Sequence, residues 1–203
     1  LPPALVRDLR LTEHGYPVYP QGPYFAPRRD GRALRLPRDP AARAEAIGVF
    51  SKADAEAYEE WDGWLAGLGR AVGPLLEQIP PRLGSRRPTD LARQARFLSR
   101  LRTLDVRGVF DLTQLFTSSI ADLVEPRFES DAMRGVLSVS GVIGTWAGPR
   151  SPGTAYVMLH HHVGDLGDGS VGGWGFPRGG MGGVSAALAG AARSFGAAIR
   201  TDA

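Results

Sequence analysis

GGWGFPRGGMGGVSAALAGAARSFGAAIRTDA, residues 172–203, is the most distinctive segment of the chain. Trp174 and Phe176 alternate with small residues, as in a short strand, and a glycine-rich turn follows them. An alanine-rich run at helical spacing comes next, and Gly196 stands where a left-handed residue would end that helix. We predict a second strand over 197–201, and therefore a βαβ-type unit with a glycine turn at the start of its helix.

The glycine cluster, residues 179–183, has two interpretations from its pattern alone. Residues 180–185, GMGGVS, nearly match the dinucleotide-binding fingerprint, and Asp202 stands near the expected position of a ribose-binding carboxylate. That fingerprint normally follows a good hydrophobic strand, however, and the residues before this one include Pro177. The second interpretation is a packing turn between strand and helix that binds no ligand.

A resemblance to a known family adds a third interpretation. The segment PRGGMGGVSAALAGAARSFGAAIRTDA closely resembles the internal glycine-rich segment of the FAD-dependent amine oxidoreductase and phytoene desaturase superfamily. The segments GVIGTWAGPRSPGTAYVMLHHHVGD (141–165) and FESDAMRGVLS (128–138) resemble one branch of it. This branch is the phytoene dehydrogenase-related NAD(P)/FAD-dependent oxidoreductases, which include the pyridine nucleotide-disulfide oxidoreductase domain-containing type. The resemblance runs in order along residues 1–203.

The resemblance implies a fold of α+β or α/β class. We expect strands and a β-hairpin of a substrate domain over residues 1–37 and a mostly helical substrate domain over 38–170. Residues 171–203 are then the beginning of a βαβ-type unit of an FAD-binding domain. In this family the phosphate fingerprint lies near the N-terminus, so we expect the chain to be an internal portion of a longer protein, inactive alone.

Local signals predict where the main elements begin. Asp30-Gly31 is typical of a hairpin turn, and Asp39-Pro40 of an N-cap followed by a proline at the first helical position. Ser51, with Asp54 three residues later, resembles a capping box. Further helices are predicted to start at Thr89, at Ser118 or Ser119, at Ser130, and at Ser151-Pro152.

Apolar periodicity predicts which helix faces are buried. A long helix over residues 58–79 is apolar along one face, with Trp61 in the core and a bend at Pro74. The helix after Thr89 is predicted to turn four residues inward, Leu91, Ala95, Leu98 and Leu101, and to place its arginines on the other side.

Composition restricts the classes of function. The chain has 203 residues, a formal charge of +3 and no cysteine, so redox chemistry would have to come from a cofactor. The arginines are mixed with carboxylates except over residues 93–102, so we expect no nucleic-acid binding. That cluster is predicted to be a solvated face, with contact to an acidic lipid layer as the rival. No apolar run reaches the roughly 18 residues of a membrane span, so we expect a cytoplasmic or peripheral membrane protein.

Candidate site residues come from two segments. On the cofactor side, the resemblance points to Gly179, Gly180, Met181 and Gly182, as support for the flavin-binding domain more than as direct ligands. On the substrate side, the candidates are Trp146, Arg150, Tyr156 and His160. Three consecutive histidines, 160–162, cannot all turn from a regular helix toward one ion, so no metal site is expected.

The resemblance implies an FAD-dependent oxidoreductase that transfers hydride between an apolar small molecule and flavin. In such an enzyme the chemistry resides in the cofactor, so no catalytic acid or base is assigned. The first alternative is a non-catalytic helical module that binds lipid or a partner protein. The second alternative is a bare Rossmann domain that begins at the glycine cluster.

Overall fold

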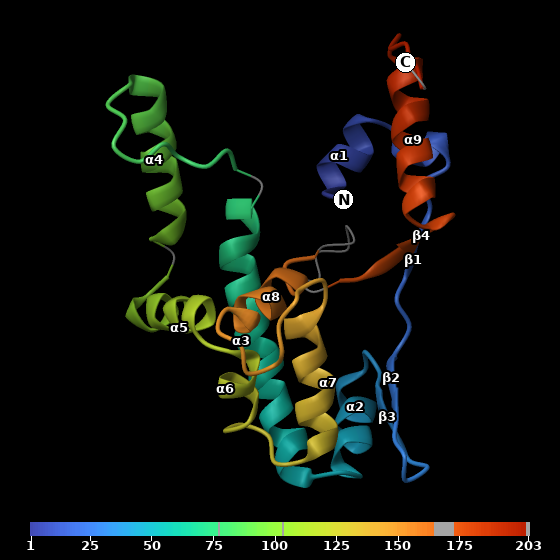
Figure 1. The fold of residues 1–203 in the computed structure, drawn as a ribbon, viewed down its shortest axis with the longest axis vertical. Helices are drawn as coiled ribbons and strands as arrows, with labels where there is room; N and C mark the ends of the chain where they lie inside the picture. The colour runs from blue at the N-terminus through green and yellow to red at the C-terminus, as the bar shows by residue number, and fades with distance from the viewer. Residues whose placement is uncertain (77, 103, 165–172, 202–203) are drawn as a thin grey trace. The chain divides into compact units, whose positions relative to one another are not determined.

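The structure is a computed structural model that describes residues 1–76, 78–102, 104–164 and 173–201. The chain forms two compact units (Figure 1): residues 1–22 together with 164–203, and residues 23–163. Among the described residues, no helix has the length and apolar character needed to cross a membrane. The expected division into domains at residues 37 and 170 stays a prediction.

The larger unit, residues 23–163, is mostly helical, as expected. It begins with an antiparallel hairpin of β2 (Tyr24–Pro27) and β3 (Ala33–Leu36), which surrounds the predicted Asp30-Gly31 turn. Seven helices follow in the described part of this unit: α2 (Pro40–Gly48), α3 (Lys52–Leu76), α4 (Pro88–Leu101), α5 (Val106–Thr117), α6 (Ile120–Val124), α7 (Asp131–Val142) and α8 (Thr154–His161).

Side-chain caps start several of these helices at the predicted positions. The carboxylate of Asp39 accepts a hydrogen bond of 2.8 Å from the backbone N–H of Ala42, with Pro40 at the first helical position of α2. Ser119 and Asp122 form a reciprocal capping box on α6, and Ser130 caps α7. These bonds satisfy amide groups that have no partner inside the helix, which is why short polar residues stand there.

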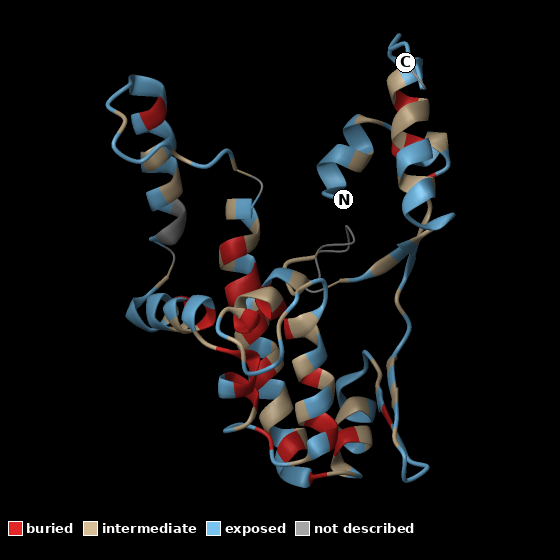
Figure 2. Cartoon of the chain, viewed as in Figure 1, coloured by how far each residue is buried: buried red, intermediate tan, exposed pale blue. Residues whose placement is uncertain are grey.

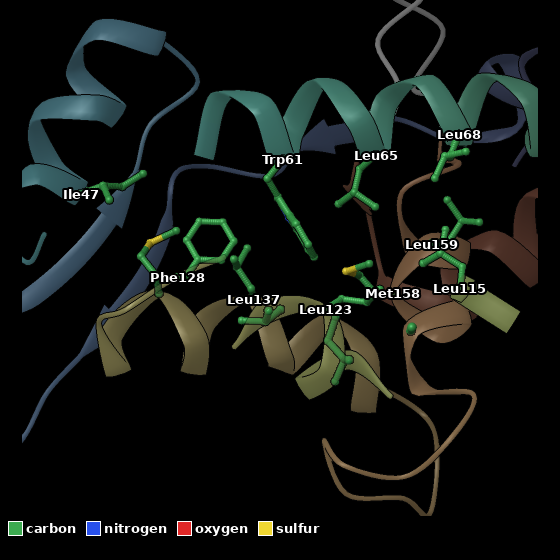
Figure 3. Packing of buried hydrophobic residues seen from close by; sticks show 14 of the residues in the cluster. Ile47, Trp61, Leu65, Leu68, Leu115, Leu123, Phe128, Leu137, Met158 and Leu159 are labelled. Atoms are coloured by element: carbon green, nitrogen blue, oxygen red, sulfur yellow. The ribbon is translucent and has the colours of Figure 1, made fainter. Parts of the chain in front are cut away.

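The core of the larger unit lies between α3 and the helices from α5 to α8 (Figures 2 and 3). Trp61 is buried, as predicted, and its ring meets Phe128 edge-on with centroids 5.6 Å apart. Trp64 joins α3 to α5 because its Nε1–H donates a 2.9 Å hydrogen bond to Asp111. The guanidinium of Arg127 covers both indole rings, at 5.8 Å from Trp61 and 5.3 Å from Trp64.

The prediction for α4 was wrong in one respect. Its supposed inward face is exposed at Leu91, Ala95 and Leu98, whereas its buried residue is Asp90. The carboxylate of Asp90 accepts a 2.6 Å hydrogen bond from the Ser85 hydroxyl, which fixes the loop before the helix. Periodicity identified the apolar face correctly, but it cannot tell whether another element covers that face.

The smaller unit combines both ends of the chain. Its elements are α1 (Pro3–Asp8), the 3₁₀-helix η1 (Leu11–His14), β1 (Val18–Pro20), β4 (Gly175–Pro177) and α9 (Gly180–Ser194). Strands β1 and β4 pair antiparallel, with Val18 opposite Pro177. A small apolar cluster holds the unit together: Leu11, Tyr16, Ala187 and Ala191.

The predicted βαβ-type unit forms only in part. The strand, the glycine turn and the helix are present, and Gly196 ends α9 with φ +89° while Ala197 N–H donates to the Ala192 carbonyl. Residues 197–201 do not form the predicted strand. Within the described chain no neighbouring strand forms backbone hydrogen bonds with them, and β4 pairs with β1 instead. Asp202, invoked for the fingerprint interpretation, lies outside the described residues.

Candidate functional site

The glycine turn, residues 179–183, is built on left-handed backbone. Gly179 has φ +77° and caps α9, and Gly180 has φ +63°. Residues with a Cβ rarely adopt these angles, so both positions favour glycine. The turn is tied to the strand pair because the N–H of Arg178 donates a 3.0 Å hydrogen bond to the carbonyl of Pro17.

The inner side of the glycine turn is closed. A Cβ placed on Gly183 would lie 1.9 Å from the carbonyl oxygen of Arg178, which no real side chain tolerates. The N–H of Gly183 donates to the carbonyl of Gly179 over 3.1 Å. The first turn of α9 therefore packs directly on the backbone that precedes it.

The outer side of the turn is bare backbone. A Cβ on Gly180 or Gly182 would meet nothing within 4 Å, and the side chain of Met181 is exposed. In the described part of the chain, the N–H groups of these three residues donate to no backbone carbonyl. N–H groups without a backbone acceptor at the positive end of a helix suit an anionic or strongly polar group.

The substrate-side candidates lie on α8 and on the loop before it. Helix α8 begins at Thr154, after Gly153 with φ +86°, so the predicted start at Ser151-Pro152 was wrong. The left-handed Gly153 turns its N–H toward the carbonyl of Ser118, at 2.9 Å. The buried Thr154 hydroxyl accepts a 2.9 Å hydrogen bond from the N–H of Ile120. Contacts to Ser118, the C-cap of α5, and to Ile120, the first residue of α6, therefore set the start of α8.

Tyr156 and His160 belong to an aromatic row that links two helices. The ring of Tyr156 stacks on Phe116 of α5, with centroids 4.7 Å apart and an interplanar angle of 20°. His160 follows one turn later, 6.3 Å from Tyr156. We call Phe116, Tyr156 and His160 the aromatic row. No local pattern in the sequence indicates that Phe116 is a neighbour of Tyr156, because the two residues are 40 positions apart.

In the described part of the chain, no ring contact or ion pair joins Trp146 or Arg150 to the aromatic row. The indole of Trp146 is fully exposed on the loop between α7 and α8. The guanidinium of Arg150 forms an ion pair with Glu125, with Nη2 and Oε1 2.6 Å apart. Both partners are solvent-exposed, so this pair adds little stability.

The three histidines have different neighbours. Nδ1 of His161 lies 3.0 Å from the carbonyl of Ser140, and Nδ1 of His162 lies 2.9 Å from the carbonyl of Met158. Burial lowers the pKa of His162, against the opposing effects of the Met158 hydrogen bond and of Asp62. Among the described residues, no group of three His, Asp or Glu side chains could hold a metal ion.

A buried carboxylate joins the starts of α3 and α7. Asp54 is 1% exposed and accepts hydrogen bonds from the N–H groups of Glu129, at 2.7 Å, and Ser130, at 3.0 Å, and from the Ser130 hydroxyl. Only half of the predicted capping box forms, because the Ser51 hydroxyl accepts from the Asp54 N–H while the carboxylate turns to α7. This cluster fixes structure and leaves no oxygen of Asp54 without a donor.

Comparison with known proteins finds relatives that match the chain over its full length. No family model matches the chain. Over its full length the chain is 34% identical to pyridine nucleotide-disulfide oxidoreductase domain-containing protein 2 of Mus musculus, and 32% identical to that of Rattus norvegicus. It spans 37% of the length of each of these curated relatives. The names of both relatives agree with the branch that the sequence resembles.

Proposed function

This chain is a homologue of pyridine nucleotide-disulfide oxidoreductase domain-containing protein 2 over its full length, and from this premise we propose that it is part of an FAD-dependent oxidoreductase. The proposed reaction moves a hydride between an apolar small molecule and flavin, in the manner of phytoene desaturases. Because the chain spans 37% of its relatives, we propose that the active form is a longer protein. The full-length homology is the observation that carries this proposal.

The glycine turn supports a place for this chain beside FAD. Bound flavin supplies the two-electron acceptor or donor of a hydride transfer. Gly180 and Gly182 leave the outer side of the turn open to close approach, and the N–H groups at the start of α9 that have no backbone acceptor suit a polar group. We propose that Gly179, Gly180, Met181 and Gly182 support the flavin-binding domain there.

The larger unit would supply the wall of the substrate cavity. Hydride transfer requires exclusion of water from the reacting atoms, and aromatic side chains give an apolar surface for this purpose. The aromatic row is half-buried at Tyr156 and exposed at Phe116 and His160, so its rings remain available for contact. We propose the aromatic row, with Trp146 and Arg150, as the substrate side.

The flavin content of the longer protein tests this proposal. It should purify yellow, with flavin absorbance that bleaches on reduction. Gly182→Val puts a branched side chain on the open side of the turn, whereas Ala186→Val adds one to an exposed position of the same helix. Loss of one polar contact of about 1.4 kcal/mol weakens flavin binding about tenfold. The Gly182→Val variant should therefore lose flavin on dialysis, whereas the Ala186→Val variant should retain it. Equal flavin retention by both variants would show that the glycine turn is not part of the flavin-binding site.

A second candidate is a non-catalytic helical module that binds lipid or a partner protein. The exposed apolar face of α4 favours it, because such a face normally lies against another surface. A colourless longer protein that is correctly folded by circular dichroism would support this module and contradict the oxidoreductase proposal.

A further inference from the structure

The charge of the chain is concentrated in one segment. Residues 78–110, which we call the basic segment, contain eight arginines and two aspartates, a formal charge of +6. Because the whole chain carries +3, the other residues together carry −3. The basic segment comprises the loop before α4, α4 itself and the first part of α5.

Both aspartates of the basic segment are already engaged. Asp90 is buried, accepts from Ser85 and pairs with Arg93 at 3.5 Å. Asp105 caps α5 by accepting a 2.7 Å hydrogen bond from the N–H of Gly108. Within the described residues, Arg96, Arg102 and Arg107 therefore have no ion pair and are exposed to solvent. Their charge is available to an anionic partner.

Large apolar side chains are exposed among these arginines. Leu83 is 88% exposed, Leu98 60%, Val106 89% and Phe110 65%. Figure 2 shows α4 with most of its surface exposed. Single exposed apolar residues are common, but this segment combines several of them with unpaired arginines. That combination is typical of helices that lie in the headgroup region of a membrane.

We propose that the basic segment binds the surface of a membrane that contains anionic phospholipids. Arg96, Arg102 and Arg107 contact phosphate groups, while the side chains of Leu98, Val106 and Phe110 enter the boundary between headgroups and acyl chains. A nucleic acid would attract the same charge but would leave these aliphatic side chains in water. Contact is peripheral, because no described helix is suited to cross the bilayer.

Vesicle flotation with the full chain tests this proposal, and it requires neither flavin nor substrate. The chain should float with phosphatidylcholine vesicles that contain phosphatidylglycerol, should not float with phosphatidylcholine alone, and should detach in high salt. Near a membrane surface each arginine strengthens binding about fivefold, so Arg96→Gln with Arg107→Gln should lower the partition coefficient about 25-fold. Arg29→Gln with Arg70→Gln, two exposed arginines outside the segment, is the matched control and should change it little.

Apolar variants separate insertion from charge alone. Leu98→Ser should weaken flotation, whereas Val49→Ser, an equally exposed position in the C-cap of α2, should not. Flotation that is equal on neutral and anionic vesicles, or equally reduced in the control pairs, overturns the proposal. Absence of flotation together with tight binding of duplex DNA that is insensitive to Leu98→Ser also overturns it and assigns the segment to nucleic acid.

Discussion

Gly183 shows how one missing side chain determines a turn. Its backbone lies so close to the Arg178 carbonyl that a methyl group there must displace the strand or the helix. Gly182, its neighbour, faces open space in the same helix. Two adjacent glycines in one motif therefore differ in whether they tolerate a side chain. The sequence alone does not show this difference.

Gly183→Ala should destabilise the smaller unit by about 1–3 kcal/mol, the usual cost of overpacking. Hydrogen exchange of the α9 amide groups measures this, since local opening exposes them. Gly182→Ala is the matched control and should leave exchange unchanged or slow it, because alanine favours helix. Equal acceleration of exchange in both variants would contradict the close contact at Gly183.

His162 should make the stability of the larger unit depend on pH. Burial lowers the pKa of His162 in the folded chain. When the pH falls below the ordinary pKa of histidine, the unfolded chain therefore takes up a proton at this residue that the folded chain does not. The free energy of unfolding should therefore fall between about pH 7.5 and about pH 5.5. Urea unfolding followed by circular dichroism measures it. His162→Gln should reduce this dependence.

At the scale of elements, Asp54 joins α3 to α7. Three donors converge on its buried carboxylate, and two of them are amide groups at the start of α7 that need an acceptor. Asp54, near the start of α3, thus supplies the hydrogen-bond acceptor for amide groups at the start of α7, which is distant in the sequence.

Asp54→Ala should lower the free energy of unfolding by about 3 kcal/mol, because it leaves buried donors without a charged acceptor. The shift of the urea midpoint measures the loss. Asp131→Ala, at an exposed position in the first turn of α7, should cost less than about 1 kcal/mol. If the two variants were equally stable, the buried cluster would have no special role.

The sequence predicted elements where their causes are local. Some helix ends depend only on residues within one turn and could therefore be predicted from the sequence. These are the caps at Asp39, Ser119 and Ser130 and the end of α9 at Gly196. The start of α8 depends on Ser118, and the supposed strand over 197–201 needed a neighbour. Both predictions failed because they depended on partners distant in sequence.

The described residues form two buried apolar clusters, one in each unit. The cluster around Trp61 and Leu65 belongs to the larger unit, and the cluster of Leu11, Tyr16, Ala187 and Ala191 to the smaller one. We therefore expect that a core substitution in one unit lowers the stability of that unit and leaves the stability of the other unchanged.

Leu65→Ala, at a fully buried position, should cost the larger unit about 2–5 kcal/mol. Hydrogen exchange resolved by residue should show faster exchange in α3 and α7 and unchanged protection in α9. Faster exchange throughout both units would mean that they unfold as one cooperative body.

The likeness to these relatives was readable from the whole sequence, whereas most tertiary contacts of the candidate site were not. The resemblance covered the full chain and agrees with the relatives that were found. Tyr156 and His160 share a helix face by their spacing, so their pairing was accessible. The stacking on Phe116 and the ion pair of Arg150 depend on tertiary contacts, which no local pattern encodes.

The exposure of Trp146 gives the chain a built-in optical probe. Of its four tryptophans, Trp61 is buried whereas Trp146 stands fully in solvent. An indole in water emits at longer wavelength and is quenched by iodide, while a buried one is shielded. Because Trp174 is also 40% exposed, quenching titrations of a Trp174→Phe variant would report on the loop before α8, and a molecule that covers the Trp146 indole should shift its emission toward the blue.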